Sequence, residues 1–214
     1  LVNAVIMPPN HRKQFLDGYR EALGTLSLLL RTAVSDELKE RESKTLRGKL
    51  SESLRRLDER YGMLEEEWRK WKKFRPQPGR DLVVQKQMIR AMSVGQLVLD
   101  AVQAHFFPHR TDGSADRAFG ERLEELIRYH EYIILKYEGK MKRSDQPYVR
   151  IGELTDTLLR ERIAASAGMT ADTAPGTGGG TVPLVVVASA IYEYGRQLRR
   201  LDKLVGRVHA GEKK

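Results

Sequence analysis

Apolar residues recur three and four positions apart along most of the chain, which is the period of an α-helix, and no segment alternates as a strand does. Proline- and glycine-containing segments, such as FRPQPGR at 74–80, separate the periodic stretches. The pattern therefore predicts an all-α fold, a single elongated bundle of five or six long helices with coiled-coil-like seams. The expected helices are 9–34, 37–74, 81–107, 114–142, 146–167 and 183–209.

Two helices carry heptad-like seams. The stronger seam keeps its 3,4 spacing for about three heptads, and it comprises Leu50, Leu54, Leu57, Tyr61, Leu64, Trp68 and Trp71, with Leu46 one step before it. The last helix has a second seam that includes Leu198, Leu201 and Val205. Such seams are satisfied either by other helices of the same chain or by a second copy, so a homodimer through these residues is one expectation.

The composition of the remaining segments predicts how the chain is organised. The helix at 81–107 is apolar on most sides and is the best candidate for the centre of the bundle. Residues 168–183 are glycine-rich and are expected to form a flexible loop. The expected organisation is an N-terminal arm or membrane-exit stub at 1–10, a helical bundle domain at 11–209 and a tail at 210–214.

Charge narrows the choice of partner. The 214 residues include 38 Lys and Arg against 29 Asp and Glu, a formal net charge of +9, which favours an anionic partner. The last helix presents a basic surface formed by Arg196, Arg199, Arg200, Lys203 and Arg207. Nucleic acid is the less favoured partner, because the basic residues are spread among acidic ones and no reading motif is present.

Candidate chemistry is sparse. The chain has no cysteine, which excludes disulfides and thiol catalysis. GTGGGT at 176–181 lacks the Lys-Ser/Thr of a phosphate-binding loop, and His105 and His109 are separated by a proline and lack a third ligand. His130 is interpreted as a hydrogen-bonded core residue, and the carboxylates of 65–67 fan out around a helix as a solvated face. We therefore expect no enzyme, no cofactor and no metal site.

The N-terminal stretch raises a different question. LVNAVIM at 1–7 is apolar, Pro8 and Pro9 end it, and His11, Arg12 and Lys13 follow. It is interpreted either as an extended arm packed on the bundle or as the last turns of a transmembrane helix. In the second case the three basic residues contact anionic head groups on the cytosolic side, following the positive-inside rule.

A resemblance favours the second interpretation. LVNAVIMPPNHRKQFLDGYREALGTLSLLLR, at 1–31, and ASAIYEYGRQLRRLDKLVGRVH, at 188–209, resemble the fusaric acid resistance / aromatic acid exporter superfamily, particularly its fungal Brefeldin A sensitivity-related, ER-transporter-like branch. The resemblance covers 1–34 and 184–209, and elsewhere only the helical character matches. It implies a cytosolic helical domain of a multi-pass transporter-like membrane protein.

The implied partners are the transmembrane portion of the parent chain and an anionic membrane surface, at the cytosolic face of the plasma membrane or endoplasmic reticulum. No binding residue of the family falls on this sequence. The alternative is a freestanding helical scaffold or adaptor that binds a partner helix or an anionic polymer such as nucleic acid.

Overall fold

The fold is all-α, as the periodicity predicts. A computed structural model describes residues 11–35, 40–71, 78–106, 114–141, 145, 147 and 184–212, and these contain helices and no strand. The helices are α1 (His11–Ser35), α2 (Glu40–Trp71), α3 (Pro78–Phe106), α4 (Ser114–Tyr137) and α6 (Leu184–Glu212). The helix expected at 146–167, the loop expected at 168–183 and the segment 1–10 lie outside the described residues.

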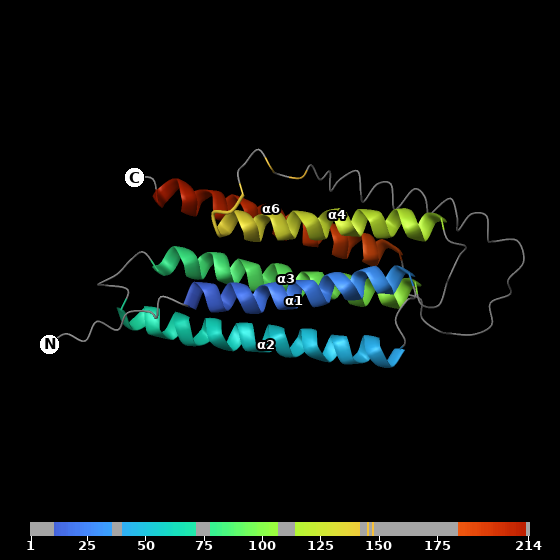
Figure 1. Cartoon of the computed structure of the whole chain (residues 1–214), viewed down its shortest axis with the longest axis horizontal. Helices are drawn as coiled ribbons and strands as arrows, with labels where there is room; N and C mark the ends of the chain where they lie inside the picture. The colour runs from blue at the N-terminus through green and yellow to red at the C-terminus, as the bar shows by residue number, and fades with distance from the viewer. Residues whose placement is uncertain are drawn as a thin grey trace, which may run out of the picture.

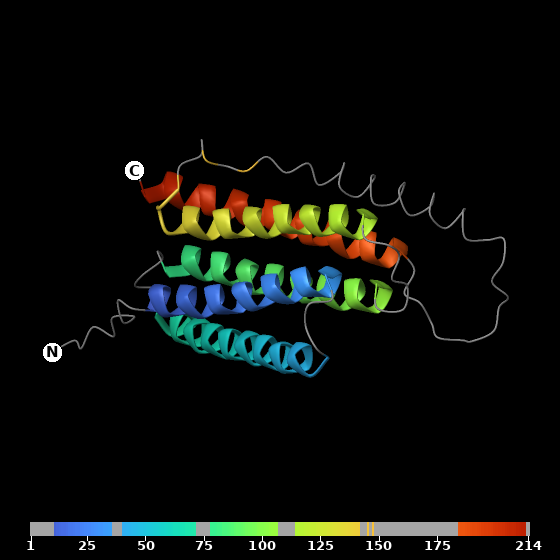
Figure 2. The ribbon, with the colours of Figure 1, turned by 45° about the vertical axis from the view of Figure 1, so that its right-hand side comes forward.

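Four of the helices form a closed ring, and the fifth packs on its outside. α1 contacts α3 and α4, and α6 contacts the same two helices, so that α1, α3, α6 and α4 surround a common core. α2 packs on α1 and α3. α1 and α3 run in one direction and α2, α4 and α6 in the other (Figures 1 and 2). One end of the bundle, here called the basal end, therefore holds the starts of α1 and α3 and the ends of α2, α4 and α6.

The core follows directly from the helical spacing of apolar residues. Phe15, Leu26 and Leu30 of α1 pack in one continuous cluster with residues of every other described helix. Each such side chain contributes about 1.5–3 kcal/mol by leaving water. α3 contacts α1, α2 and α6 and is central, as predicted, but it also keeps one exposed stripe.

Helix ends differ from the prediction where local chemistry decides them. α3 begins at Pro78, three residues early, because a proline in the first turn lacks only an N–H that would have no helical partner. α6 continues to Glu212, so that part of the expected tail is helical.

α4 ends at Tyr137 rather than at 142, because Gly139 adopts a left-handed conformation with φ of 77°. The N–H of Gly139 donates to the Lys136 carbonyl at 2.9 Å, and that of Lys140 to the Leu135 carbonyl at 2.9 Å. These two bonds are the Schellman arrangement, which satisfies carbonyls that a helix end otherwise leaves open.

Gly95 of α3 lies where the helices approach one another closely. A Cβ at this position would lie 2.7 Å from Cδ2 of Leu26 and 3.2 Å from the Tyr194 ring, both fully buried side chains, whereas a Cβ at Gly48 of α2 would meet nothing within 4 Å. We expect Gly95→Ala to lower the free energy of unfolding by about 1–2 kcal/mol, since overpacking exceeds the gain in helix propensity.

The same substitution at Gly48 is the matched control. Gly48→Ala is expected to raise the free energy of unfolding by about 0.5–1 kcal/mol, because it gains propensity without a clash. Urea titrations of both variants measure the difference. Equal effects of the two substitutions would show that α1, α3 and α6 do not meet closely at Gly95.

Candidate functional site

The structure shows the surroundings of those metal and catalytic candidates that lie within the described residues. His130 is fully buried and hydrogen-bonded, which confirms its interpretation as a core residue. Glu66 and Glu67 are exposed and Glu65 is paired with Arg69 at 3.3 Å, as expected of a solvated face. The side chain of His105, together with His109 and 176–181, lies outside the described residues. Within the described part of the chain, no cluster of His, Asp or Glu could hold a metal ion.

The main polar feature of the core is a chain of hydrogen bonds between four helices. The hydroxyl of Tyr19 (α1) lies 2.7 Å from Nε2 of His130 (α4) and donates to the Met88 carbonyl (α3) at 2.7 Å. Nδ1 of His130 lies 2.7 Å from the hydroxyl of Tyr194 (α6). Both tyrosine rings meet the imidazole edge-to-face, with centroids 5.6 and 5.8 Å away. We call Tyr19, His130 and Tyr194 the buried triad.

One placement of protons satisfies all three contacts. Tyr19 donates to Met88, the neutral imidazole donates from Nε2 to the Tyr19 oxygen, and Tyr194 donates to Nδ1. A second ring proton, at Nδ1, would displace the Tyr194 proton from this contact, and burial lowers the pKa of His130 to about 3. Burial raises the pKa of Tyr19 and of Tyr194 well above the ordinary value. The triad is therefore a neutral structural network at physiological pH.

Arg12 has an intramolecular role that its sequence context does not reveal. Its guanidinium stacks on the Tyr137 ring, 4.2 Å from the centroid, and donates to the Tyr137 backbone carbonyl. This carbonyl is one of those left open at the end of α4, so Arg12 completes the cap begun by Gly139. His11 is half-buried and Lys13 is exposed. Contact of the three residues with lipid stays a prediction.

Further polar links tie the helices together at the basal end. The Tyr137 hydroxyl donates to Asp81 of α3 at 2.7 Å. Arg20 of α1 forms an ion pair with Glu138, just after α4. The start of α1 is thus connected through the end of α4 to the start of α3.

We expect Arg12→Ala to lower the free energy of unfolding by about 1–2 kcal/mol, because a half-buried carbonyl loses its donor and the cation–π contact disappears. Lys13→Ala removes the same charge from an exposed neighbour and is expected to change stability by less than about 0.5 kcal/mol. Thermal or urea unfolding of the two variants measures this difference. If the two variants unfold alike, Arg12 does not cap α4.

The predicted seams are buried within the chain. Leu50, Leu57 and Leu64 of α2 are covered, on a helix that packs against α1 and α3, and Leu54 and Tyr61 are nearly so. Trp68 is half-buried beside Leu64, and the side chain of Trp71 is outside the described residues. Leu198, Leu201 and Val205 of α6 are fully buried. Of the two alternatives, satisfaction within one chain is the one that the structure shows for these residues, and a homodimer stays a prediction.

The basic surface of the last helix is exposed as predicted. Arg196, Arg199, Arg200, Lys203 and Arg207 all face solvent along one side of α6. Two acidic residues lie near them. Glu193 pairs with one member of the stripe, Arg196, at 2.7 Å, and Asp202 binds Lys136 of α4. The positive charge of the stripe therefore comes mainly from Arg199, Arg200, Lys203 and Arg207.

No protein-family model, curated protein or solved structure matches this chain. Among the described helices, none combines the length and the apolar composition needed to cross a bilayer.

Proposed function

We propose that this chain is the water-exposed helical domain of a multi-pass transporter-like membrane protein, at the cytosolic face of its membrane. Its role is structural and regulatory, and it performs no catalysis of its own. The membrane portion of the parent chain precedes α1, and the basal end of the bundle lies nearest to it.

The main support is the way in which the start of α1 is fixed. Arg12 joins the first turn of α1 to the end of α4, and Tyr137 joins that end to Asp81 at the start of α3. A displacement of whatever precedes residue 11 is thereby transmitted to three helices at once. This is the coupling that a regulatory domain attached through its N-terminus needs.

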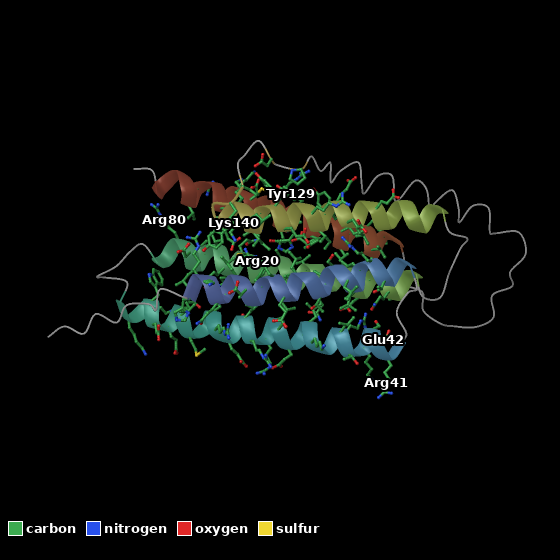
Figure 3. The ribbon with its side chains drawn as sticks, in the orientation of Figure 1. Arg20, Arg41, Glu42, Arg80, Tyr129 and Lys140 are labelled. Atoms are coloured by element: carbon green, nitrogen blue, oxygen red, sulfur yellow. The ribbon has the colours of Figure 1, made fainter. Side chains whose placement is uncertain are left out.

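The charge of the basal end also supports the proposal. Exposed basic residues there include Lys13, Lys70, Arg80, Lys140 and Arg207. Figure 3 shows Arg80 at the start of α3, whereas Arg41 and Glu42 lie at the opposite end of the bundle. The carboxylates of Glu138 and Asp202 are neutralised by Arg20 and Lys136, although Glu66 and Glu67 add exposed negative charge. A basic end next to a chain entry suits anionic head groups.

Translation of the coding sequence immediately upstream of Leu1 tests the proposal. We expect about six apolar segments of about 20 residues each, and the tagged gene product should resist extraction from membranes by alkaline carbonate. A product that begins at or near Leu1, has no such segments on either side and is released by carbonate would refute the proposal.

The second candidate is a freestanding scaffold that binds an acidic helix or an anionic polymer. The cationic stripe of α6 is the observation that favours it, because such a stripe suits a row of phosphates or carboxylates. Salt-sensitive binding to duplex DNA by a protein without membrane segments would support this candidate over the first.

A further inference from the structure

α3 and α6 together form one exposed face. Gln87 of α3 donates to Gln197 of α6 at 2.7 Å, directly between the two helices. Val83 and Arg90 lie one turn on either side of Gln87, and Arg200 lies one turn beyond Gln197, so all three lie beside this contact. The other basic residues of α6 continue around its outer side. We call this surface the α3/α6 face.

The antiparallel register divides the face into two halves. Arg80 lies seven residues before Gln87, and it is therefore level with α6 about seven residues after Gln197, near Arg207. Arg90 lies within the same half and is exposed, whereas the ammonium of Lys86 lies over the Tyr61 ring of α2, 5.7 Å from its centroid. This half thus combines two basic residues of α3 with the basic residues of α6, of which Arg196 is paired with Glu193, and it adjoins the basal end.

The other half carries large exposed apolar side chains, with the small polar Ser93 and Ser189 exposed among them. Leu97 of α3 is 59% exposed, and by the same register it is level with the start of α6, where Val185 is 58% and Val186 44% exposed. Tyr192, 52% exposed, lies between the two halves. Five of the seven large hydrophobic residues exposed in the described part of the chain are on these two helices, the fifth being Val83. Exposed apolar side chains beside a basic cluster are typical of an interaction surface.

We propose that the α3/α6 face docks on a bilayer that contains anionic lipids, so that the domain lies on its side along the membrane. The basic half contacts phosphate and carboxylate head groups, and the apolar half inserts shallowly beside them. A polyanion such as nucleic acid would match the basic half but leave the apolar half without a contact. The inference rests on the proposed function only for the choice of a bilayer. It adds that the α3/α6 face, along the length of the bundle, and not the basal end alone, contacts the lipid.

Flotation of the 214-residue chain with vesicles tests whether the basic half of the α3/α6 face binds anionic lipids. We expect binding to phosphatidylcholine vesicles that contain phosphatidylserine and little binding to phosphatidylcholine alone. In the α6 variant, Arg199→Glu, Arg200→Glu and Lys203→Glu are combined, and its affinity is expected to fall about a hundredfold, since each basic residue at an anionic surface contributes about a factor of five.

The matched control carries the same charge change on α2. Lys44→Glu, Lys49→Glu and Arg60→Glu also replace three exposed basic residues, and we expect an affinity within about threefold of the unchanged chain. Circular dichroism confirms that both variants are folded. Equal losses in the two variants would show that net charge and not the α3/α6 face determines binding, and would overturn the proposal.

A labelling experiment tests the orientation. Because the chain contains no cysteine, a single Leu97→Cys or Met63→Cys substitution carries one environment-sensitive dye. Met63 is 60% exposed on α2 and serves as the control. Anionic vesicles should increase and blue-shift the emission at position 97 but not at position 63. A bundle that stands on its basal end would leave both unchanged, and stronger binding to duplex DNA than to vesicles would also overturn the proposal.

These outcomes separate the two proposals. Vesicle binding through the face by a protein without membrane segments would refute the proposed function and leave the face as a peripheral membrane surface. Membrane segments upstream of Leu1 without vesicle binding would do the reverse.

Discussion

Replacement of His130 by alanine is expected to lower the free energy of unfolding by about 3–5 kcal/mol, a large fraction of the stability of a typical domain. The substitution removes a fully buried ring from the junction of α1, α3, α4 and α6 and leaves a cavity. It also removes the acceptor of the Tyr194 hydroxyl, and the residue Tyr194 is only 1% exposed. An unsatisfied buried donor alone costs about 1–3 kcal/mol.

Substitutions of two tyrosines on α6 distinguish the contribution of the hydrogen bond to stability from that of side-chain packing. Tyr194→Phe keeps the ring but leaves Nδ1 of His130 without a donor, so we expect a loss of about 1–3 kcal/mol. Tyr192→Phe makes the same change at an exposed position two residues earlier and should alter stability by less than about 0.5 kcal/mol. Urea unfolding of the three variants gives these values. A His130→Ala protein as stable as the parent would show that the buried triad does not hold the helices together.

The second large effect is a loss of stability in mild acid. Burial lowers the pKa of His130 to about 3 in the folded chain, whereas an unfolded histidine titrates near 6.5. Between these values the unfolded state binds the additional proton, so the free energy of unfolding falls as the pH falls below about 6.5. At about 1.4 kcal/mol per pH unit, acidification from pH 7 to pH 5 should remove about 2 kcal/mol. The full contribution of the neutral His130 to the free energy of unfolding is present above about pH 6.5.

Carboxylates whose pKa is lowered in the folded chain affect the free energy of unfolding in a different pH range. Hydrogen bonds from Arg55 and Arg56 lower the pKa of Glu52 to about 2, and those from Arg196 and Gln197 lower the pKa of Glu193. Any stability from these groups is fully present above the unfolded carboxyl pKa of about 4.3 and is lost only below it. The interval from pH 7 to pH 5 therefore separates the effect of His130 from that of these two carboxylates.

His130→Gln provides the control, because its amide retains one donor and one acceptor without a titrating group in this range. Stability measured by urea titration at pH 7, 6 and 5 should fall steeply for the parent chain and stay nearly level for the variant. Parallel pH profiles would mean that His130 is already protonated in the folded chain or exposed to water.

The sequence was sufficient to predict the helices that the structure describes, but not their arrangement. The spacing of Leu50, Leu54 and Leu57 defines the buried side of α2 without any knowledge of its neighbours. Whether that side meets α1, α3 or a second chain depends on which complementary surfaces exist elsewhere, which periodicity does not reveal. The end of α4 was overestimated because a single left-handed Gly139 outweighs the apolar pattern around it.

The polar sites were predicted only in part for a similar reason. His130 was recognisable as a core residue from its place on an apolar helix face, but Tyr19 and Tyr194 are 111 and 64 residues away, and only tertiary register aligns their hydroxyls with the imidazole. Arg12 has the appearance of a surface residue until the end of α4 is placed beside it. The α3/α6 face was missed because α3 is apolar on most sides, so its exposed stripe is set by packing rather than by sequence contrast.

The place of α6 in the ring has a consequence for synthesis on the ribosome. α6 is the last described helix, and it closes the ring by covering α3 and α4. While residues 184–212 are still in the exit tunnel, His130 lacks its hydroxyl donor from Tyr194, and the sides of α3 and α4 that α6 contacts lack their cover. The nascent chain therefore exposes apolar core residues until α6 has left the tunnel, and a chaperone is most useful in this interval.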